Sequence, residues 1–168
     1  MTVTIEQIAE EHIEGFHACL DSVAREEMFL GQTQAPPLER VVEFVRANIS
    51  GDLPQYLALL EGRVIGWCDA IPHWAGALKH RAGLGMGVLE SHRGKGIGSR
   101  LVSETLSHAQ RIGVRRVDLE VRADNTAAIR LYTTAGFKLE GRKSMGLFHG
   151  GQYHDTIEMG LLLESAAA

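Results

Sequence analysis

The sequence predicts a mixed α/β domain, and three observations lead to that class. The chain contains seven strand-like and four helix-like segments, in the order strand, two helices, three strands, helix, strand, helix and two strands. Two glycine turns, Glu61-Gly62 and Gly150-Gly151, separate strand pairs at hairpin distance. A length of 168 residues, 45% of them hydrophobic, suits one core, so we expect a single domain over residues 1–168.

The first segments combine one short strand, at residues 3–5, with two helices. The first helix is expected over residues 10–27. Its apolar stripe consists of Ile13, Phe16, Cys19 or Leu20, and Val23. Pro36-Pro37 opens the second helix, because proline suits the first helical turn, and Gly51 ends it.

The middle of the chain is expected to form three strands, at residues 55–60, 63–70 and 80–89. In the third strand, glycines at 83, 85 and 87 alternate with apolar residues. Because glycine weakens a strand, three glycines on one face indicate that another group approaches this backbone closely.

Two helices and three strands make up the remainder. The helices are expected at residues 97–112 and 125–135, and the strands at 116–121, 137–148 and 152–163. Gly113 and Gly136 are expected to end the two helices. Asp124 or Asn125 is expected to cap the start of the second.

Charge and composition exclude several classes of function. Seventeen basic against 21 acidic residues give a net charge of −4, which argues against binding nucleic acid through bulk charge. No apolar run approaches the roughly 18 residues of a membrane span, and the acidic N-terminus is unlike a signal peptide. We therefore expect a cytoplasmic protein with no membrane contact. Cys19, Cys68 and the eight histidines lack the spacing of a metal site, so no metal is expected.

The strongest chemical motif is Arg93-Gly94-Lys95-Gly96-Ile97-Gly98, which stands between a strand and a helix. The first helical turn presents unpaired N–H groups and the positive end of the helix dipole, and the glycines leave these donors open. Such a turn suits a pyrophosphate. The P-loop pattern is absent, and the spacing differs from that of a dinucleotide fingerprint, although Glu120 lies 22 residues beyond Gly98. The third interpretation is a coenzyme A site.

This turn resembles the Gln/Arg-x-x-Gly-x-Gly/Ala motif of the GNAT acetyltransferase superfamily, with Arg93, Gly96 and Gly98 at the defined positions. A second stretch, LEVRADNTAAIRLY at residues 119–132 followed by Gly136-Phe137, is similar to another segment of that family. The motifs are most similar to those of ribosomal-protein alanine and spermidine acetyltransferases. The resemblance covers residues from about 63 to 163, with its core motifs at 80–137.

The resemblance implies a central sheet of about seven strands that splays open between its fourth and fifth strands, with acetyl-CoA in the opening. It places the pantetheine arm against the backbone of Val88 and the pyrophosphate on the N–H groups of residues 94–99. Asn125 is implied as a partner of the pantetheine arm. The implied acetyl-CoA-binding residues are Val88, Arg93, Gly94, Lys95, Gly96, Ile97, Gly98, Ser99 and Asn125.

The implied reaction is direct transfer of the acetyl group from the thioester to an amine. Tyr132 matches the general acid of the family, and a phenol can protonate a departing thiolate. Its alternative role is a packed aromatic residue in a short helix. Glu120 matches the general base of the ribosomal-protein alanine acetyltransferases. Its alternative role is a solvated or salt-bridged strand carboxylate.

The acceptor is left open between two classes. The two helices within residues 10–51 belong to the acceptor side in this family, and the acidic residues of the first could attract a small cationic amine. A protein N-terminus is the alternative acceptor, and a non-catalytic acyl-CoA-binding module is the alternative function. A homodimer is expected only by resemblance to the family.

Overall fold

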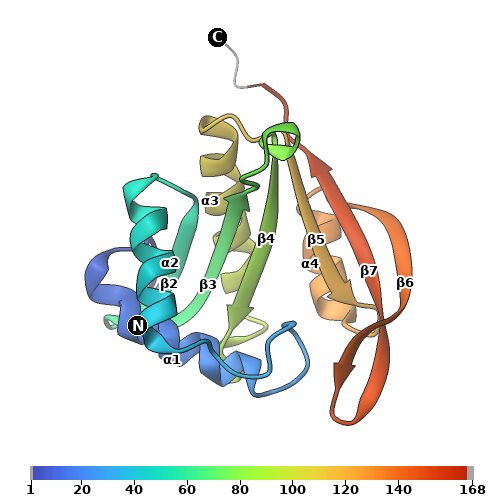
Figure 1. The fold of residues 1–168 in the computed structure, drawn as a ribbon. Helices are drawn as coiled ribbons and strands as arrows, with labels where there is room; N and C mark the ends of the chain where they lie inside the picture. Colours follow the sequence, from blue (N-terminus) through green and yellow to red (C-terminus); the bar gives the residue numbers. More distant parts are fainter. Residues whose placement is uncertain (1, 166–168) are drawn as a thin grey trace.

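The computed structural model describes residues 2–165, so both ends of the expected domain, residue 1 and residues 166–168, lie outside the described part. The helices are α1 (Ile13–Ala24), α2 (Leu38–Ser50), α3 (Ile97–Arg111) and α4 (Thr126–Thr134) (Figure 1). The strands are β1 (Val3–Gln7), β2 (Gln55–Leu60), β3 (Arg63–Pro72), β4 (Arg81–Val88), β5 (Arg116–Arg122), β6 (Lys138–His149) and β7 (Gln152–Leu162). The predicted order of elements is confirmed.

The strands form one seven-stranded sheet in the order β1-β2-β3-β4-β5-β7-β6. Only β4 and β5 are parallel, and they pair only where Arg81–Gly83 lies beside Arg116–Asp118. Beyond this short contact the two strands diverge, which opens the sheet into a V (Figure 1). The expected splay between the fourth and fifth strands is therefore confirmed.

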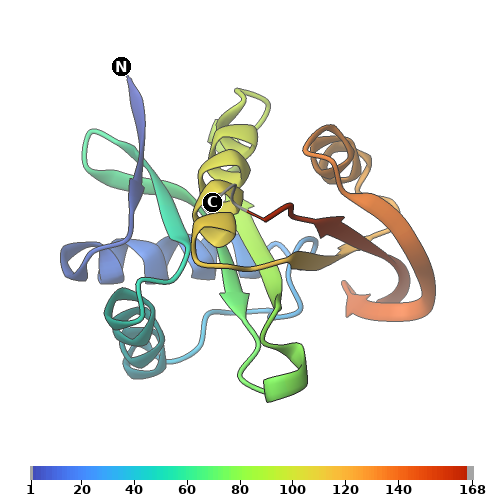
Figure 2. The same cartoon turned by 90° about the horizontal axis from the view of Figure 1, so that it is seen from above.

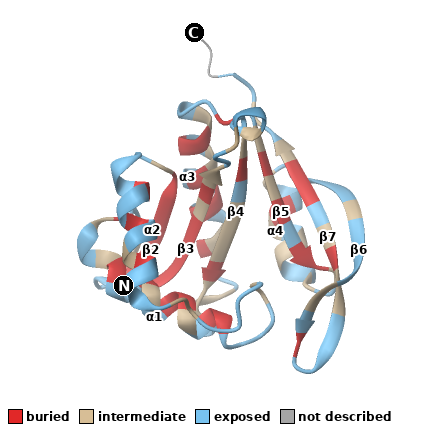
Figure 3. Ribbon diagram, viewed as in Figure 1, coloured by how far each residue is buried: buried red, intermediate tan, exposed pale blue. Residues whose placement is uncertain are grey.

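Helices cover both faces of the sheet and create two hydrophobic cores. One core includes Leu101 and Val102 of α3 and Tyr132 of α4, and the other includes Phe16 of α1 and Val45 of α2. Figure 2 shows α3 and α4 on the side opposite α2. The buried residues concentrate in β2, β3, β5 and on one side of α1 and α3, whereas β6 is largely exposed (Figure 3). Within β3, Val64 and Trp67 belong to the core with α1 and α2, whereas Ile65, Cys68 and Ala70 belong to the core with α3 and α4.

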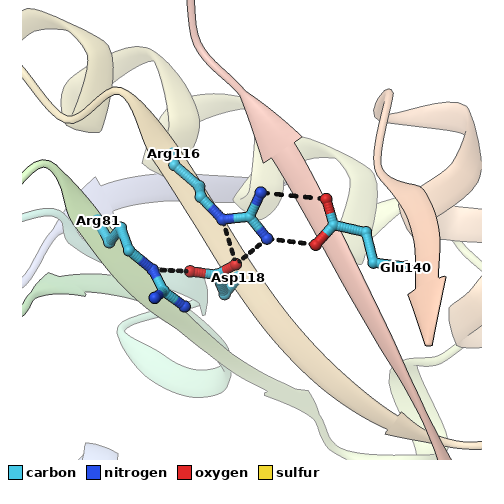
Figure 4. A network of polar contacts seen from close by, with 4 residues as sticks. All are labelled: Arg81, Arg116, Asp118 and Glu140. Atoms are coloured by element: carbon cyan, nitrogen blue, oxygen red, sulfur yellow. Dashed lines mark hydrogen bonds and ion pairs between the residues drawn. The ribbon is translucent and has the colours of Figure 1, made fainter. Parts of the chain in front are cut away.

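An ion-pair chain crosses the closed end of the V (Figure 4). Arg81 Nε on β4 lies 2.9 Å from Asp118 Oδ2 on β5, and Arg116 Nε donates to Asp118 Oδ1 at 2.7 Å. Arg116 also forms a two-pronged pair with Glu140 of β6 and thereby lowers the pKa of that carboxyl. The side chain of Arg116 passes over β7 at Gly160. A Cβ added to Gly160 would lie 2.7 Å from Arg116 Nη2, so the glycine leaves room for the guanidinium. These ion pairs connect β4, β5 and β6 at the closed end of the V.

Candidate active site

A cleft of about 380 Å³ occupies the opening between β4 and β5 and continues to the start of α3 and to α4. Every residue that the sequence predicted for the site, except Lys95, lines this cleft. Those lining residues are Val88, Arg93, Gly94, Gly96, Ile97, Gly98, Ser99, Glu120, Asn125 and Tyr132. The fold thus brings the two motif segments to one place, which we call the donor cleft.

The glycine turn presents backbone N–H groups to the donor cleft. Gly94 and Gly96 have φ values of +72° and +76°, a left-handed conformation that favours glycine, and a Cβ on either would meet no atom within 4 Å. The first N–H of α3 to be paired is that of Arg100, which donates to Gly96 O at 3.3 Å. The N–H groups of Ile97, Gly98 and Ser99 precede it and lack an acceptor within the helix. This donor set fits a pyrophosphate.

The two basic side chains of the turn are held by protein groups. Arg93 donates to both carboxylate oxygens of Glu26, at 2.8 and 2.6 Å, and to Val88 O at 2.8 Å. Its guanidinium also stacks over Phe29, 4.4 Å from the ring centre. Lys95 Nζ donates to Ser91 O at 3.0 Å. The open positive potential at the turn therefore comes from the helix end, and Arg93 connects the turn to the segment after α1.

Tyr132 of α4 lies at the inner end of the donor cleft and is 8% exposed. Its ring packs edge-on against Phe137, with 5.8 Å between ring centres. Burial, and secondarily the nearby Cys68, raise the pKa of the Tyr132 phenol. The phenol therefore stays protonated at neutral pH, which is the state that a general acid requires. The ring is packed as the second alternative from the sequence describes, and it also lines the cleft, as the general acid role requires.

Glu120 of β5 also lines the cleft, and two donors hold its carboxylate. Thr156 donates to one oxygen and Lys143 Nζ donates to the other at 3.0 Å. Burial alone would raise the pKa of Glu120, but these two hydrogen bonds outweigh it and leave the pKa below its ordinary value. The carboxylate is therefore ionised and salt-bridged, and Lys143 also reaches Glu158 at 3.2 Å.

Asn125 is the N-cap of α4, as one of the two sequence alternatives predicted. Its Oδ1 accepts a hydrogen bond from Ala128 N at 3.2 Å. The side-chain amide N–H groups remain available to the donor cleft that Asn125 lines.

The glycines of β4 have a cause that the sequence did not identify. The register pairs Trp67 with Gly87 and Asp69 with Gly85. A Cβ at Gly87 would lie 2.4 Å from the indole of Trp67, so that side chain requires the glycine. A Cβ at Gly85 would lie 3.4 Å from a carboxylate oxygen of Asp69. Neighbouring β3 therefore supplies a group that closely approaches this backbone at Gly87, whereas a Cβ at Gly83 would meet no atom within 4 Å.

A polar bridge spans the mouth of the V and was also missed from the sequence. His149, at the end of β6, contacts Leu30 O through Nε2 at 2.8 Å and Arg122 Nη1 through Nδ1 at 3.4 Å. The carbonyl accepts and the guanidinium donates, so Nε2 carries the proton and Nδ1 accepts. Gly150 N donates to Glu27 at 3.2 Å. The segment between α1 and α2 therefore meets the β6–β7 turn (Figure 1).

Comparisons with known proteins agree with this fold. The model of the Acetyltransferase (GNAT) family matches residues 10–137, so the chain belongs to the GNAT acetyltransferase family and is an acetyltransferase. It is 27% identical over 138 residues to the L-amino acid N-acetyltransferase AaaT of Escherichia coli, covering 81% of this chain and 85% of that protein.

Two further similarities cover different shares of the chain. A segment of 56 residues is 50% identical to N-alpha-acetyltransferase RimI of Mycobacterium tuberculosis, covering 33% of this chain and 34% of that protein. The structure of yncA from Salmonella typhimurium with acetyl-CoA superposes with a TM-score of 0.91 at 19% identity, covering 100% of this chain and 98% of that one. The latter likeness concerns the fold.

Within residues 2–165, no group of three or more His, Cys, Asp or Glu side chains is arranged to hold a metal ion. No helix in that part of the chain is long and apolar enough to cross a membrane.

Proposed function

We propose that this protein transfers the acetyl group of acetyl-CoA to a primary amine of a small molecule. The observation that carries the proposal is the donor cleft itself. Its outer end presents the unpaired N–H groups at the start of α3, and its inner end holds a protonated phenol, that of Tyr132. A pyrophosphate-binding end and a proton-donating end within one cleft suit a coenzyme A thioester.

In this proposal the chain binds the donor along its length. The N–H groups of residues 94–99 bind the pyrophosphate, and Ser99 adds a hydroxyl at the same end. The backbone of Val88 and the amide of Asn125 bind the pantetheine arm. Acetyl-CoA supplies an acetyl group that is activated as a thioester. The bound acetyl-CoA in the yncA structure, which shares this fold, supports the assignment.

Two residues of the donor cleft are assigned to proton transfer. Tyr132 donates a proton to the departing sulfur, because its phenol is protonated at neutral pH and its side chain lines the cleft. The raised pKa opposes this transfer, because it makes the phenol a weaker acid. Glu120 remains the base predicted from the sequence. Its ionised state supports that role, whereas its bonds to Thr156 and Lys143 weaken its basicity.

A small amine is the favoured acceptor, and a protein N-terminus is the alternative. The similarity to AaaT extends over 81% of this chain, and the printed name of that protein specifies amino acids. The similarity to RimI covers 33% of this chain. The polar bridge between Leu30 and His149 crosses the opening of the V, which an extended peptide would need to enter. This bridge therefore also favours a small acceptor.

The test is release of CoA thiol by the purified protein with acetyl-CoA and a panel of amino acids, simple amines, polyamines, aminoglycosides and short peptides. We expect turnover with a small amine and an increase in Tm with acetyl-CoA alone. Turnover restricted to peptides would select the alternative acceptor. A raised Tm with no turnover on any amine would select the non-catalytic module.

A further inference from the structure

A second cleft lies on the other side of β3 and β4, between the sheet and helices α1 and α2. Its volume is about 350 Å³. Its walls are mostly apolar and include Phe16, Leu20, Leu30, Val41, Phe44 and Trp67. Met86 lines both this cleft and the donor cleft, so the two adjoin at β4. We call this second space the acceptor cleft.

Asp69 is the one acidic residue that lines the acceptor cleft within residues 2–165. It follows the apolar run of β3, and Gly85 stands opposite it, so no β4 side chain covers the carboxylate. Asp69 is partly exposed to the cleft, and its burial raises the pKa of its carboxyl to about 7. No hydrogen bond or ion pair within the described residues offsets that burial. A carboxylate placed this way against apolar walls costs folding free energy.

The cationic residue that lines the same cleft does not neutralise Asp69. Arg40 of α2 is 76% exposed at its side chain and lies 3.6 Å from Glu43 of the same helix. Its charge is therefore at the solvent-facing rim, where Glu43 balances it. Asp69 is left as an uncompensated negative group inside an apolar cleft, and such a cleft is complementary to a cation with an apolar body.

We propose that the acceptor cleft binds the amine substrate, and that Asp69 binds its ammonium group and accepts a proton from it. This inference rests on the proposed function. The acceptor is then a primary amine with one cationic centre and a branched aliphatic or phenyl group. A polyamine is disfavoured, because its further ammonium groups would have to be buried against apolar walls.

The proton balance of the step is complete with groups on this chain. In this step Asp69, in place of Glu120, takes one proton from the ammonium group and later releases it to water. The free amine bonds to the acetyl carbonyl carbon, the carbon–sulfur bond breaks, and its electron pair remains on sulfur. Tyr132 protonates that sulfur and regains a proton from the acylated nitrogen. The products are an amide and a free thiol. A base with a pKa near the working pH is efficient in such a transfer.

The test compares two acceptors of similar shape in wild type and Asp69→Asn. Benzylamine is an ammonium ion at neutral pH, whereas phenylhydrazine is already neutral and needs neither a counter-charge nor a proton acceptor before attack. We expect Asp69→Asn to lower kcat/KM at least 100-fold for benzylamine and less than tenfold for phenylhydrazine. Glu104→Gln, an exposed acidic position on α3, is the matched control. If phenylhydrazine is not turned over, its inhibition constant against benzylamine replaces kcat/KM in the comparison.

Several outcomes would overturn the inference. An equal loss for both compounds would indicate a structural role for Asp69, and an unchanged rate with benzylamine would exclude any role. A wild-type preference for spermidine over benzylamine would contradict the acceptor class. The Tm increase with acetyl-CoA must persist in Asp69→Asn. If the wild type itself turns over no amine, the proposed function fails first, and this inference fails with it.

Discussion

Replacing Asp69 with asparagine should change how the free energy of unfolding depends on pH. The pKa of Asp69 is about 7 in the folded protein, against an ordinary value of 3.8. A carboxyl whose pKa is raised by folding costs nothing at pH values below both pKa values. Its cost grows as the pH rises from about 4 to 7 and is complete above 7. Wild type should therefore lose stability over this interval relative to Asp69→Asn.

The magnitude follows from the two pKa values, since one pH unit corresponds to about 1.4 kcal/mol. Between pH 5 and pH 8 the difference in unfolding free energy between the two proteins should change by about 2.5 kcal/mol. Water that reaches the carboxylate would reduce this change to about 1 kcal/mol. For a chain of this length the change in relative Tm is about 2–10 °C. The burial cost of the asparagine amide does not depend on pH and cancels.

Urea unfolding followed by circular dichroism at pH 5, 6, 7 and 8 measures the effect, with Glu104→Gln as the control. We expect the Asp69→Asn curve to diverge from the wild-type curve as the pH rises, and the control curve to stay parallel to it. Parallel curves for Asp69→Asn would refute the argument, because they would mean that Asp69 titrates alike in the folded and unfolded states.

Four further predictions concern the donor cleft and the sheet. Tyr132→Phe should lower kcat at least tenfold and leave the affinity for acetyl-CoA nearly unchanged. The control Tyr153→Phe, at an exposed tyrosine, should change neither quantity. Weaker acetyl-CoA binding without a rate defect would contradict the assignment of Tyr132 as the general acid. Gly96→Glu should abolish acetyl-CoA binding measured by calorimetry, because bulk and negative charge would enter the pyrophosphate position; unchanged affinity would place the donor elsewhere. Asn125→Asp should keep the helix cap and the Tm but raise the KM for acetyl-CoA. Asn125→Ala should raise this KM as well and also lower the stability by about 1 kcal/mol. Equal KM values in wild type and Asn125→Asp would show that the Asn125 amide does not bind acetyl-CoA. Arg116→Ala should destabilise the protein by about 2 kcal/mol in urea unfolding, because Asp118 and Glu140 would lose their shared partner. A loss below about 0.5 kcal/mol would show that the link from β5 to β6 through Arg116 is worth no more than an ordinary surface pair.

The elements could be predicted because their determinants are local. Alternation and turn glycines define the strands, and the cap at Asn125 is a property of adjacent residues. Element ends were less accurate. The first helix was expected to reach residue 27 but ends at Ala24, because Glu27 adopts a left-handed φ of +48° that a helix cannot contain. Its start at residue 10 is a 3-10 turn, Glu10–His12, and the α-helix itself begins at Ile13.

The residues that line the donor cleft could be predicted because most of them lie in two continuous motifs, whereas their hydrogen-bond partners lie far away in sequence. Arg93 pairs with Glu26 across 67 positions, and Glu120 with Thr156 across 36. No local pattern contains these separations. Asp69 was missed for the same reason. A single acidic residue in an apolar strand is a weak indication until the strand register places Gly85 beside it.

The two faces of β4 connect the donor and acceptor clefts. Gly87 allows the Trp67 indole to cross the strand, and Gly85 leaves the Asp69 carboxylate uncovered. Met86, between them, lines both clefts. Side chains at 85 or 87 would therefore fill the acceptor cleft or displace Trp67, while the backbone that faces the donor cleft would keep its course. If the acceptor cleft has the assigned role, Gly85→Val should raise the KM for the amine and leave the KM for acetyl-CoA unchanged. A change in acetyl-CoA binding alone would reverse the assignment of the two faces.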